Sequence, residues 1–323
     1  MGRNKLRTSN PLAGFIKLVL GVTFLGGLIF GVSYSVSRLS EVTLADLYNG
    51  YGPLSEVAGS YIEKIDSPIV DKIVDSANLD SQEDEPEAKV VFKIALLSDS
   101  HNDNDNLAKA LDVVKEEGVE EVIFLGDYTA FGPISELTAA KKVMDNSGLT
   151  YYSIPGDHDL GSTGDATNFT KVFDKRYQKL RLNGVTLILL DNSDNEKGVD
   201  NAQLEWFTKE LLALKKDEVN FVIMANPLYN TNGLNKLMGE NDEAVSKQAV
   251  LLLSLVREAP VKAIISGDNH LSGEYKDPVK GGLLHIGVGA LTNIPEARNL
   301  QSPRFDYLTV YEDGTFKTKE EVL

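Results

Sequence analysis

From residue 90 onward the chain repeats one pattern that limits the folds open to it: short apolar runs alternate with segments of helical periodicity. Residues 90–97 read as a buried strand, and apolar residues then recur at helical spacing from Leu107 to Val114 before Gly118 ends the helix. Further strands are predicted at 122–125, 151–154, 185–190, 221–224 and 261–265, and further helices at 136–144 and 203–214. Strands that alternate with helices are typical of an α/β domain with much parallel sheet.

Two segments near the end of the chain break this alternation. Residues 282–291 and 305–318 read as antiparallel strands, and the second contains a turn at Asp313 and Gly314. We therefore expect a mixed sheet or a sandwich, with helices outside.

The N-terminal region has a different composition. Residues 1–17 contain four basic residues and no acidic one, and residues 18–37 contain no charged residue. A helix of that length spans about 30 Å of hydrocarbon, so we predict a transmembrane signal anchor at 18–37. Basic residues before the span place residues 1–17 in the cytoplasm. A cleaved signal peptide and a buried helix of a soluble core are the alternatives.

Residues 38–88 are predicted to form an acidic stalk or linker. They combine a turn-rich break at 47–56 with an acidic, proline-containing stretch from residue 78 onward. The domain itself is expected over 89–323, on the extracytoplasmic side of the cell membrane.

Composition excludes several classes of partner and site. The formal net charge of −16 argues against nucleic acid as a partner. The chain has no cysteine, which excludes disulfides and thiolate metal sites.

Polar residues follow five of the apolar runs, at the point where each predicted strand ends. These positions carry side chains that bind metals or phosphate: Asp99 and His101, then Asp127, then Asp157, His158 and Asp159, then Asn226, and finally Asp268 and His270. Because the carboxyl ends of strands line the ligand crevice of an α/β sheet, five loops would bring these groups to one rim. Taken singly, an Asp here could be a turn former or a helix cap, as we expect for Asp103 or Asp105 and for Asp191. His285 is expected to be an ordinary strand residue.

Four short motifs occur in a fixed order: Asp99-x-His101, Gly126-Asp127, Gly156-x-His158-Asp159 and Gly267-x-x-His270. In this order they resemble the calcineurin-like metallophosphoesterases, a superfamily that includes purple acid phosphatases, over about residues 89–310. Residues 224–230 are also similar to a purple acid phosphatase segment. The resemblance implies a four-layered αββα sandwich of mixed β-sheets with two divalent metal ions at its rim.

The resemblance also implies roles for the first metal site and for catalysis. Asp127 would bridge the two ions, and Asp99, His101 and His270 would complete the first site. Imidazole and carboxylate ligands suit manganese, iron or zinc there. His158 matches the family's histidine that contacts phosphate and assists the leaving group, so His158 and Asp127 are the predicted catalytic residues. Two cations would neutralise a phosphate mono- or diester and activate a metal-bound hydroxide.

The second metal site departs from the family pattern at three positions. The family has Asn where this chain has Asp157, and His where it has Ala225 and Asp268. The site would then comprise Asp127, Asp157 and Asp268, with Asn226 as a candidate substitute ligand. Such an oxygen-only set favours manganese, magnesium or calcium. Four carboxylates, two divalent ions and a hydroxide sum to about −1, so we expect a slower enzyme or one that uses a harder metal.

Three hypotheses about function follow. The first is a membrane-anchored metal-dependent phosphoesterase that faces outward and acts on a phosphorylated small molecule or surface substrate. The second is a catalytically degenerate extracytoplasmic domain that binds a metal or a phosphate, which Ala225 favours. The third is an envelope interaction protein whose loops are only structural. Loops 127–133 and 229–242 are expected to overhang the rim, but the sequence predicts neither the substrate nor the oligomeric state.

Overall fold

A computed structural model describes residues 88–323 except 163, 230–236 and 294–300. The fold reported below is that of the unit Ala88–Leu323. The predicted cytoplasmic segment, the predicted anchor at 18–37 and nearly all of the predicted stalk lie outside the described residues. Within the described part of the chain, none of the helices combines the length and the apolar character that crossing a membrane requires.

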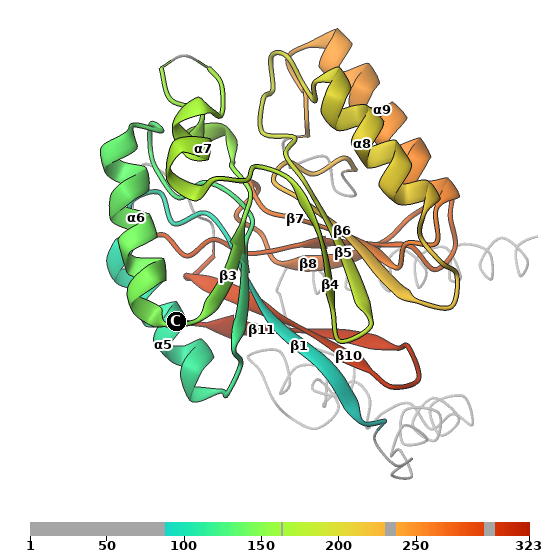
Figure 1. Ribbon diagram of the computed structural model, residues 1–323, viewed down its shortest axis with the longest axis horizontal. Helices are drawn as coiled ribbons and strands as arrows, with labels where there is room; N and C mark the ends of the chain where they lie inside the picture. Colours follow the sequence, from blue (N-terminus) through green and yellow to red (C-terminus); the bar gives the residue numbers. More distant parts are fainter. Residues whose placement is uncertain (1–87, 163, 230–236, 294–300) are drawn as a thin grey trace, which may run out of the picture. The chain divides into compact units, whose positions relative to one another are not determined.

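The first of two sheets has five strands in the order β11-β10-β1-β2-β3 (Figure 1). Its strands are β1 (Val90–Leu97), β2 (Glu121–Phe124), β3 (Thr150–Ser153), β10 (Arg304–Tyr311) and β11 (Phe316–Val322). The pairs β1–β2 and β2–β3 are parallel, whereas β10 pairs antiparallel with both β1 and β11. The side chain of Asp313 accepts hydrogen bonds from Thr315 in the predicted turn between β10 and β11.

The second sheet has six strands in the order β4-β5-β6-β7-β9-β8. Its strands are β4 (Gln178–Leu182), β5 (Val185–Leu190), β6 (Val219–Met224), β7 (Ala263–Ser266), β8 (Gly273–Lys276) and β9 (Leu284–Gly287). The prediction that residues 282–291 form an antiparallel strand was wrong in part. β9 pairs antiparallel with β8 but parallel with β7, because after β7 the chain first forms β8 at the sheet edge and then turns back to place β9 between the two.

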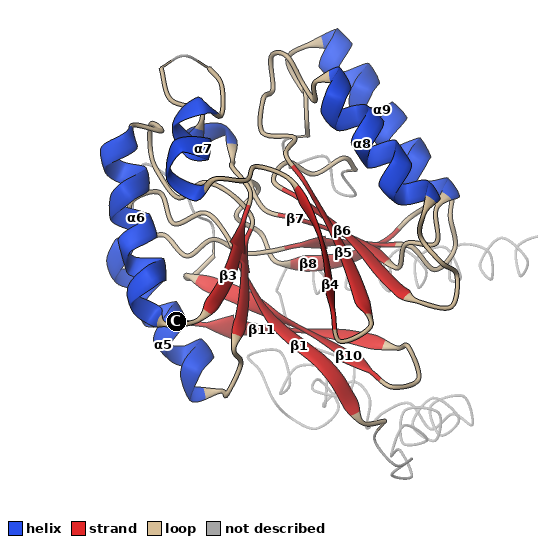
Figure 2. Ribbon diagram, viewed as in Figure 1, coloured by secondary structure: helices blue, strands red, loops and turns tan. Residues whose placement is uncertain are grey.

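Helices cover the outer faces of both sheets (Figure 2). The first sheet is covered by α5 (Asn104–Glu116), α6 (Ile134–Ser147) and α7 (Thr167–Phe173), and the second by α8 (Asn201–Leu212) and α9 (Glu243–Glu258). Asp103 caps α5 by accepting a hydrogen bond from the backbone N–H of Asn106, as one of the two sequence alternatives predicted.

The core consists of three apolar layers that follow from the period of each element. In β1, Ile94 and Leu96 face the second sheet, where they pack with residues of β5 and β6, while Ala95 and Leu97 face α5 and α6. The outer face of the second sheet packs on α8 and α9 through Phe207 and similar side chains. Successive side chains of a strand point to opposite faces of its sheet, so one face packs on the other sheet and the other face packs on helices. The described unit is therefore a sandwich of mixed sheets between two helical layers.

Candidate metal centre

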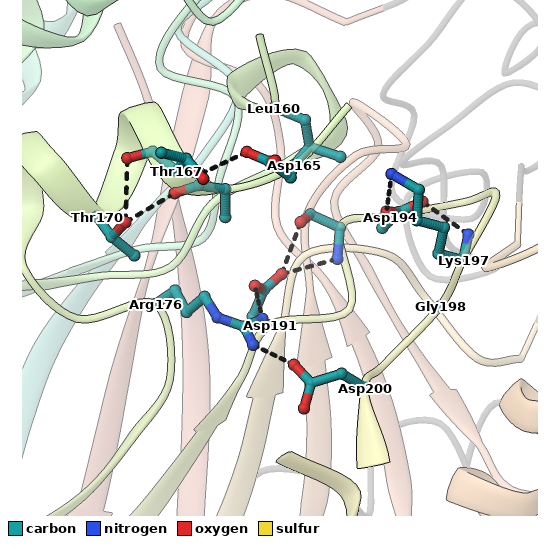
Figure 3. Close-up of a pocket in the computed structure, with 12 residues that line it drawn as sticks. Leu160, Asp165, Thr167, Thr170, Arg176, Asp191, Asp194, Lys197, Gly198 and Asp200 are labelled. Atoms are coloured by element: carbon teal, nitrogen blue, oxygen red, sulfur yellow. Dashed lines mark hydrogen bonds and ion pairs between the residues drawn. The ribbon is translucent and has the colours of Figure 1, made fainter. Parts of the chain in front are cut away.

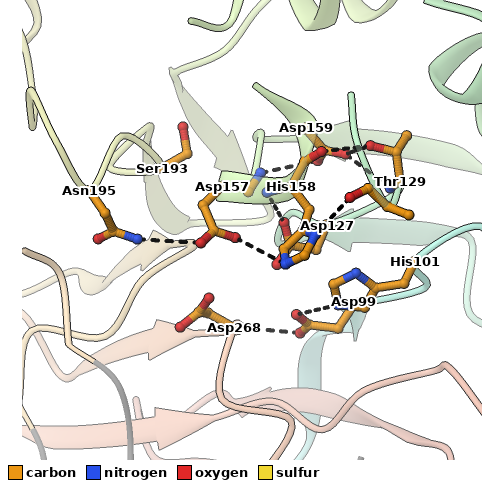
Figure 4. Close-up of polar contacts among 12 residues, drawn as sticks. Asp99, His101, Asp127, Thr129, Asp157, His158, Asp159, Ser193, Asn195 and Asp268 are labelled. Carbon is orange, nitrogen blue, oxygen red and sulfur yellow. Dashed lines mark hydrogen bonds and ion pairs between the residues drawn. The ribbon is translucent and has the colours of Figure 1, made fainter. Parts of the chain in front are cut away.

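The candidate side chains lie on loops that follow strands of both sheets (Figure 4). Asp99 and His101 follow β1, and Asp127 follows β2. A 3₁₀ turn of residues Asp157–Asp159 comes after β3, and Asp268 and His270 follow β7. Backbone hydrogen bonds join these loops, for example from the N–H of Asp99 to the carbonyl of Gly126 at 3.0 Å and from that of His101 to the carbonyl of Asp127 at 3.0 Å.

Three of these residues form a group that we call the imidazole cluster: Asp99, His101 and His270. One ligand atom of each lies within 4.8 Å of the others. The Nε2 atoms of the two histidines are 3.0 Å apart, and Asp99 Oδ1 lies 3.3 Å from that of His270 and 3.8 Å from that of His101. All three ligand atoms therefore converge on one point.

Three carboxylates form a second group that we call the carboxylate cluster: Asp127, Asp157 and Asp268. Their ligand atoms also lie within 4.8 Å of one another. The backbone N–H of Asp268 donates to Asp99 Oδ2 at 3.2 Å, which places the two clusters side by side. The six predicted metal ligands are thus divided into the two groups that the sequence predicted, apart from the bridging role of Asp127, which remains a prediction.

The backbone at these residues is unusual. Eight described residues other than glycine have a positive φ, and five of them belong to the two clusters: Asp99 (57°), His101 (44°), Asp127 (60°), Asp268 (65°) and His270 (55°). Each such residue costs on the order of 1 kcal/mol relative to an ordinary conformation. The strain is concentrated where the side chains must turn toward one another.

Two glycines permit the close approach of the loops. A Cβ on Gly126 would lie 2.6 Å from the backbone nitrogen of Gly156, and a Cβ on Gly156 would collide with Asp127 Oδ1. Only glycine fits at these positions, so the two glycines of the second and third motifs bring Asp127 against the turn that carries Asp157 and His158.

Asp99 and Asp127 are both buried, with 0% and 2% exposure, but their electrostatic surroundings differ. Burial alone would raise the pKa of Asp99, yet His270 and His101 hold it below its ordinary value. The pKa of Asp127 is raised well above its ordinary value, by burial first and then by the charges of Asp157 and other carboxylates. Burial also lowers the pKa of His101 to about 4, so this imidazole is neutral and able to bind a metal at neutral pH.

His158 stands beside the two clusters with 45% of its side chain exposed. Its Nδ1 lies 2.9 Å from the carbonyl oxygen of Ala130, which can only accept, so Nδ1 carries the proton. Its ring meets that of His101 edge-on at 4.6 Å, and its Nε2 lies 3.9 Å from Asp157 Oδ1. Nε2 is therefore the atom available for proton transfer to or from a ligand at the rim.

Asp159, the last residue of the third motif, has a different position. It is fully buried and accepts hydrogen bonds from the backbone N–H groups of Tyr128, Thr129 and Gly156 at 3.0–3.3 Å. Asp159 therefore ties the loop of Asp127 to the turn of His158.

Asn226 and Asn195 lie next to the carboxylate cluster. Asn226 is 1% exposed, and its Nδ2 donates to the carbonyl of Asn192 and to Asn195 Oδ1. Its Oδ1 is buried and has no hydrogen-bond partner among the described residues. Asn195 was missed at the sequence level. Its Nδ2 lies 3.5 Å from Asp157 Oδ2, and the signal that could have found it is the polar run 191–195 directly after β5.

The donor sets fit divalent cations. The imidazole cluster offers two nitrogens and a carboxylate, which is a set that zinc, iron and manganese accept. The carboxylate cluster offers only oxygens, which suits manganese, magnesium or calcium. Asp157 Oδ1 is buried and, within the described part of the chain, lacks a hydrogen-bond partner. A buried carboxylate oxygen in this condition is costly unless a cation or a water compensates it.

A pocket of about 320 Å³ lies between the loop after β5 and the start of α7 (Figure 3). Arg176 in its lining pairs with Asp191 at 2.6 Å and with Asp200, and Lys197 donates to the carbonyl of Gly164 at 2.8 Å. Both cations of the lining are thus already paired, and Asp191 serves this ion pair and its own turn, in agreement with its predicted role as a turn residue.

Comparison with known proteins places this geometry in a family. A sequence profile of the calcineurin-like phosphoesterases matches residues 92–272, more than half of the chain. The chain belongs to this family. Its members are metal-dependent phosphoesterases with a dimetal centre, and the chain carries candidate ligands for one. A search of curated protein sequences found no match.

Solved structures of the same fold include two phosphatases. A dimetal phosphatase from Danio rerio aligns over 72% of this chain and 97% of its own length, with 16% identity and a TM-score of 0.54. Purple acid phosphatase PPD1 from yellow lupin (Lupinus luteus) aligns over 73% of this chain, with 15% identity and a TM-score of 0.55. This chain covers 52% of the lupin protein. At these identities the likeness concerns the fold.

Proposed function

We propose that the protein hydrolyses a phosphate mono- or diester with two divalent cations, one at the imidazole cluster and one at the carboxylate cluster. The observation that carries this proposal is the convergence of the two ligand groups at one rim, each within 4.8 Å. Bound there, two divalent cations would neutralise the phosphate and lower the pKa of the attacking water. Protonation of the leaving group is left to a side chain of the protein.

His158 is the residue placed to assist the leaving group. Because Nδ1 donates to the carbonyl of Ala130, Nε2 faces away from that anchor, and the imidazolium form can transfer its Nε2 proton to the ester oxygen. Asp159 and Thr129 fix the loop behind it: Thr129 Oγ1 donates to the carbonyl of His158 at 2.9 Å. The imidazole is thus held in one orientation, which reduces the entropy lost in the reaction.

We further propose that the domain acts outside the cytoplasm, on a phosphorylated small molecule or a surface substrate, and is tethered by the segment 18–37. The basic residues before this uncharged segment support that orientation. The net charge of −16 supports a substrate other than nucleic acid.

One observation favours the alternative of a degenerate binding domain. Ala225, which stands where the resemblance places a histidine, is 1% exposed and packs in the core between the two sheets. It supplies no ligand atom to the second cation, so that cation depends on carboxylates and an amide. If these do not hold it, the protein would bind one metal without turnover.

The test uses the full-length chain, purified in mild detergent, stripped of metal and reloaded separately with manganese, calcium, zinc or iron. Metal per chain is measured by elemental analysis, and hydrolysis of p-nitrophenyl phosphate and bis(p-nitrophenyl) phosphate is followed in parallel. We expect two ions per chain with manganese and metal-dependent hydrolysis. One ion and no hydrolysis with any metal would favour the degenerate domain.

Matched variants separate the site from the fold. Asp99→Asn should lose metal and activity, while Asp112→Asn on the exposed side of α5 should keep both, since its side chain is 68% exposed. Equal activity in the two variants would contradict the proposal.

A further inference from the structure

We propose that Asn195 is a positioning residue for the second cation: it holds Asp157 by one oxygen and leaves the other oxygen to the metal. The inference rests on the proposed function, because it concerns the cation at the carboxylate cluster. Asn195 Nδ2 lies 3.5 Å from Asp157 Oδ2, and Figure 4 shows the amide pointing at this carboxylate. The opposite oxygen, Asp157 Oδ1, is buried and has no hydrogen-bond partner among the described residues.

The orientation of the Asn195 amide is fixed by donors on its far side. Its Oδ1 accepts from the backbone N–H of Gly239 at 3.0 Å and from Asn226 Nδ2 at 3.3 Å. A backbone N–H can only donate, so the oxygen must face Gly239 and the NH₂ group must face Asp157. The amide therefore offers Asp157 a hydrogen-bond donor on the Oδ2 side.

The support behind Asn195 is rigid. Gly239 packs so closely on the start of α9 that a Cβ there would lie 2.5 Å from the backbone nitrogen of Ser246. On the other side, Asn192 Oδ1 accepts from the backbone N–H groups of Ala225 and Asn226 at 3.0 Å. The amide that faces Asp157 is therefore held by Asn226, in the loop after β6, and by Gly239, which packs on helix α9.

This arrangement explains how a cluster without a nitrogen ligand can keep its geometry. Three carboxylates repel one another, and Asp157 is more exposed than Asp127, with 27% of its side chain accessible against 2% for Asp127. A carboxylate that is free to rotate would lose rotamer entropy on binding a cation, and would turn away from its neighbours without one. Asn195 prevents both, in the way that outer partners orient metal-binding carboxylates elsewhere.

Asn220 is a matched control for Asn195. It is a buried asparagine near the opposite end of β6, and its Nδ2 donates to the carbonyls of Lys215, Glu218 and Pro260 at 2.9–3.0 Å. Its Oδ1 is also unpartnered within the described residues. Asn220→Ala therefore removes a similar number of buried hydrogen bonds far from the candidate ligands.

The experiment compares manganese binding to the full-length parent, Asn195→Ala and Asn220→Ala by titration calorimetry and by electron paramagnetic resonance of coupled manganese. In Asn195→Ala we expect an unchanged first ion and a second ion bound about tenfold or more weakly, with two ions per chain recovered at saturating manganese. Asn220→Ala should bind both ions as the parent does, even if its thermal midpoint falls.

Two results would overturn the positioning role while leaving the proposed function intact: a second dissociation constant in Asn195→Ala within twofold of the parent, or an equal weakening of both ions. A parent that binds fewer than two ions would instead overturn the dimetal function itself, and the role of Asn195 with it.

Discussion

The imidazole cluster and the carboxylate cluster lie side by side, yet they treat the same chemical group in opposite ways. Asp99 and Asp127 are both buried carboxylates, but the pKa of Asp99 is lowered by its histidine neighbours and that of Asp127 is raised by burial and by Asp157. In the imidazole cluster, an ionised Asp99 and a neutral His101 are already in the protonation states that bind a metal. The carboxylate cluster stores repulsion that a cation would relieve.

Because their electrostatic surroundings differ, the imidazole cluster and the carboxylate cluster should not bind the same ion equally well. Neutral imidazole nitrogens favour borderline metals, while a crowded set of oxygens favours hard cations with a high demand for negative charge. The first cation should therefore bind with less dependence on its identity, and the second should discriminate more strongly.

The largest effect is expected at Asp127 of the carboxylate cluster. Asp127→Asn removes the carboxylate that is predicted to bridge the two cations, so kcat/KM with bis(p-nitrophenyl) phosphate should fall by about a thousandfold, or about 4 kcal/mol. Manganese stoichiometry should fall with it. Asp112→Asn serves as the control, and a loss of less than tenfold in Asp127→Asn would break the idea of a shared carboxylate.

A smaller effect is expected at His158, which belongs to neither cluster. His158→Ala should lower kcat by about a hundredfold on phenyl phosphate, whose leaving group needs a proton, and much less on p-nitrophenyl phosphate. Metal content should not change. The measurement is the ratio of the two rates, and equal losses on both substrates would show that His158 does not protonate the leaving group.

The comparison can also be reversed by making the second cluster resemble the first. Asp157→Asn combined with Asp268→His removes two negative charges and adds an imidazole, so turnover of a phosphodiester should rise about tenfold and the preferred metal should shift toward zinc. Asp112→Asn with Glu116→His makes the same charge change on the exposed face of α5. No gain in the first double variant, with its fold intact, would count against the electrostatic account.

The smallest effect on turnover is expected at Asp306, a buried carboxylate outside both clusters. Burial raises its pKa to about 7, whereas the unfolded chain loses this proton near the ordinary value of 3.8. The folded state therefore binds more protons between these values, and the free energy of unfolding falls as pH rises from about 4 to about 7. Asp306→Asn removes this term.

Urea unfolding of the metal-free protein measures this pH-dependent contribution of Asp306 to the free energy of unfolding. The stability of Asp306→Asn relative to the parent should increase by on the order of 1–3 kcal/mol between pH 4 and pH 7, while turnover stays within twofold. A constant difference across this range would show that Asp306 does not titrate as its burial requires.

Much of the fold could be predicted because its signals are local. The strands and helices of the domain follow from apolar period and caps, and Asp103 caps α5 as expected. The pairing of β9 could not be predicted in the same way. Its parallel direction relative to β7 follows from the position of β8 at the sheet edge, which depends on long-range strand pairing and not on residues 284–287 alone.

The candidate site divides along the same line. Asp127 and His158 could be predicted as site residues because strand ends and motifs mark them. Asn195 was missed because it lies 38 residues from Asp157 in sequence, and its amide acquires meaning only through the hydrogen bonds with Gly239 and Asn226.

The sequence by itself determined which groups reach the rim, since the carboxyl ends of strands are fixed by local pattern and six candidate ligands stand there. Tertiary structure decided the distances within and between the two groups, because only the packing of one sheet on the other brings Asp268 within hydrogen-bonding distance of Asp99 and leaves Asp127 among carboxylates. The physical reason is that composition sets the total charge of a site, while pKa and metal preference depend on distances of a few ångströms between residues that are far apart in the chain.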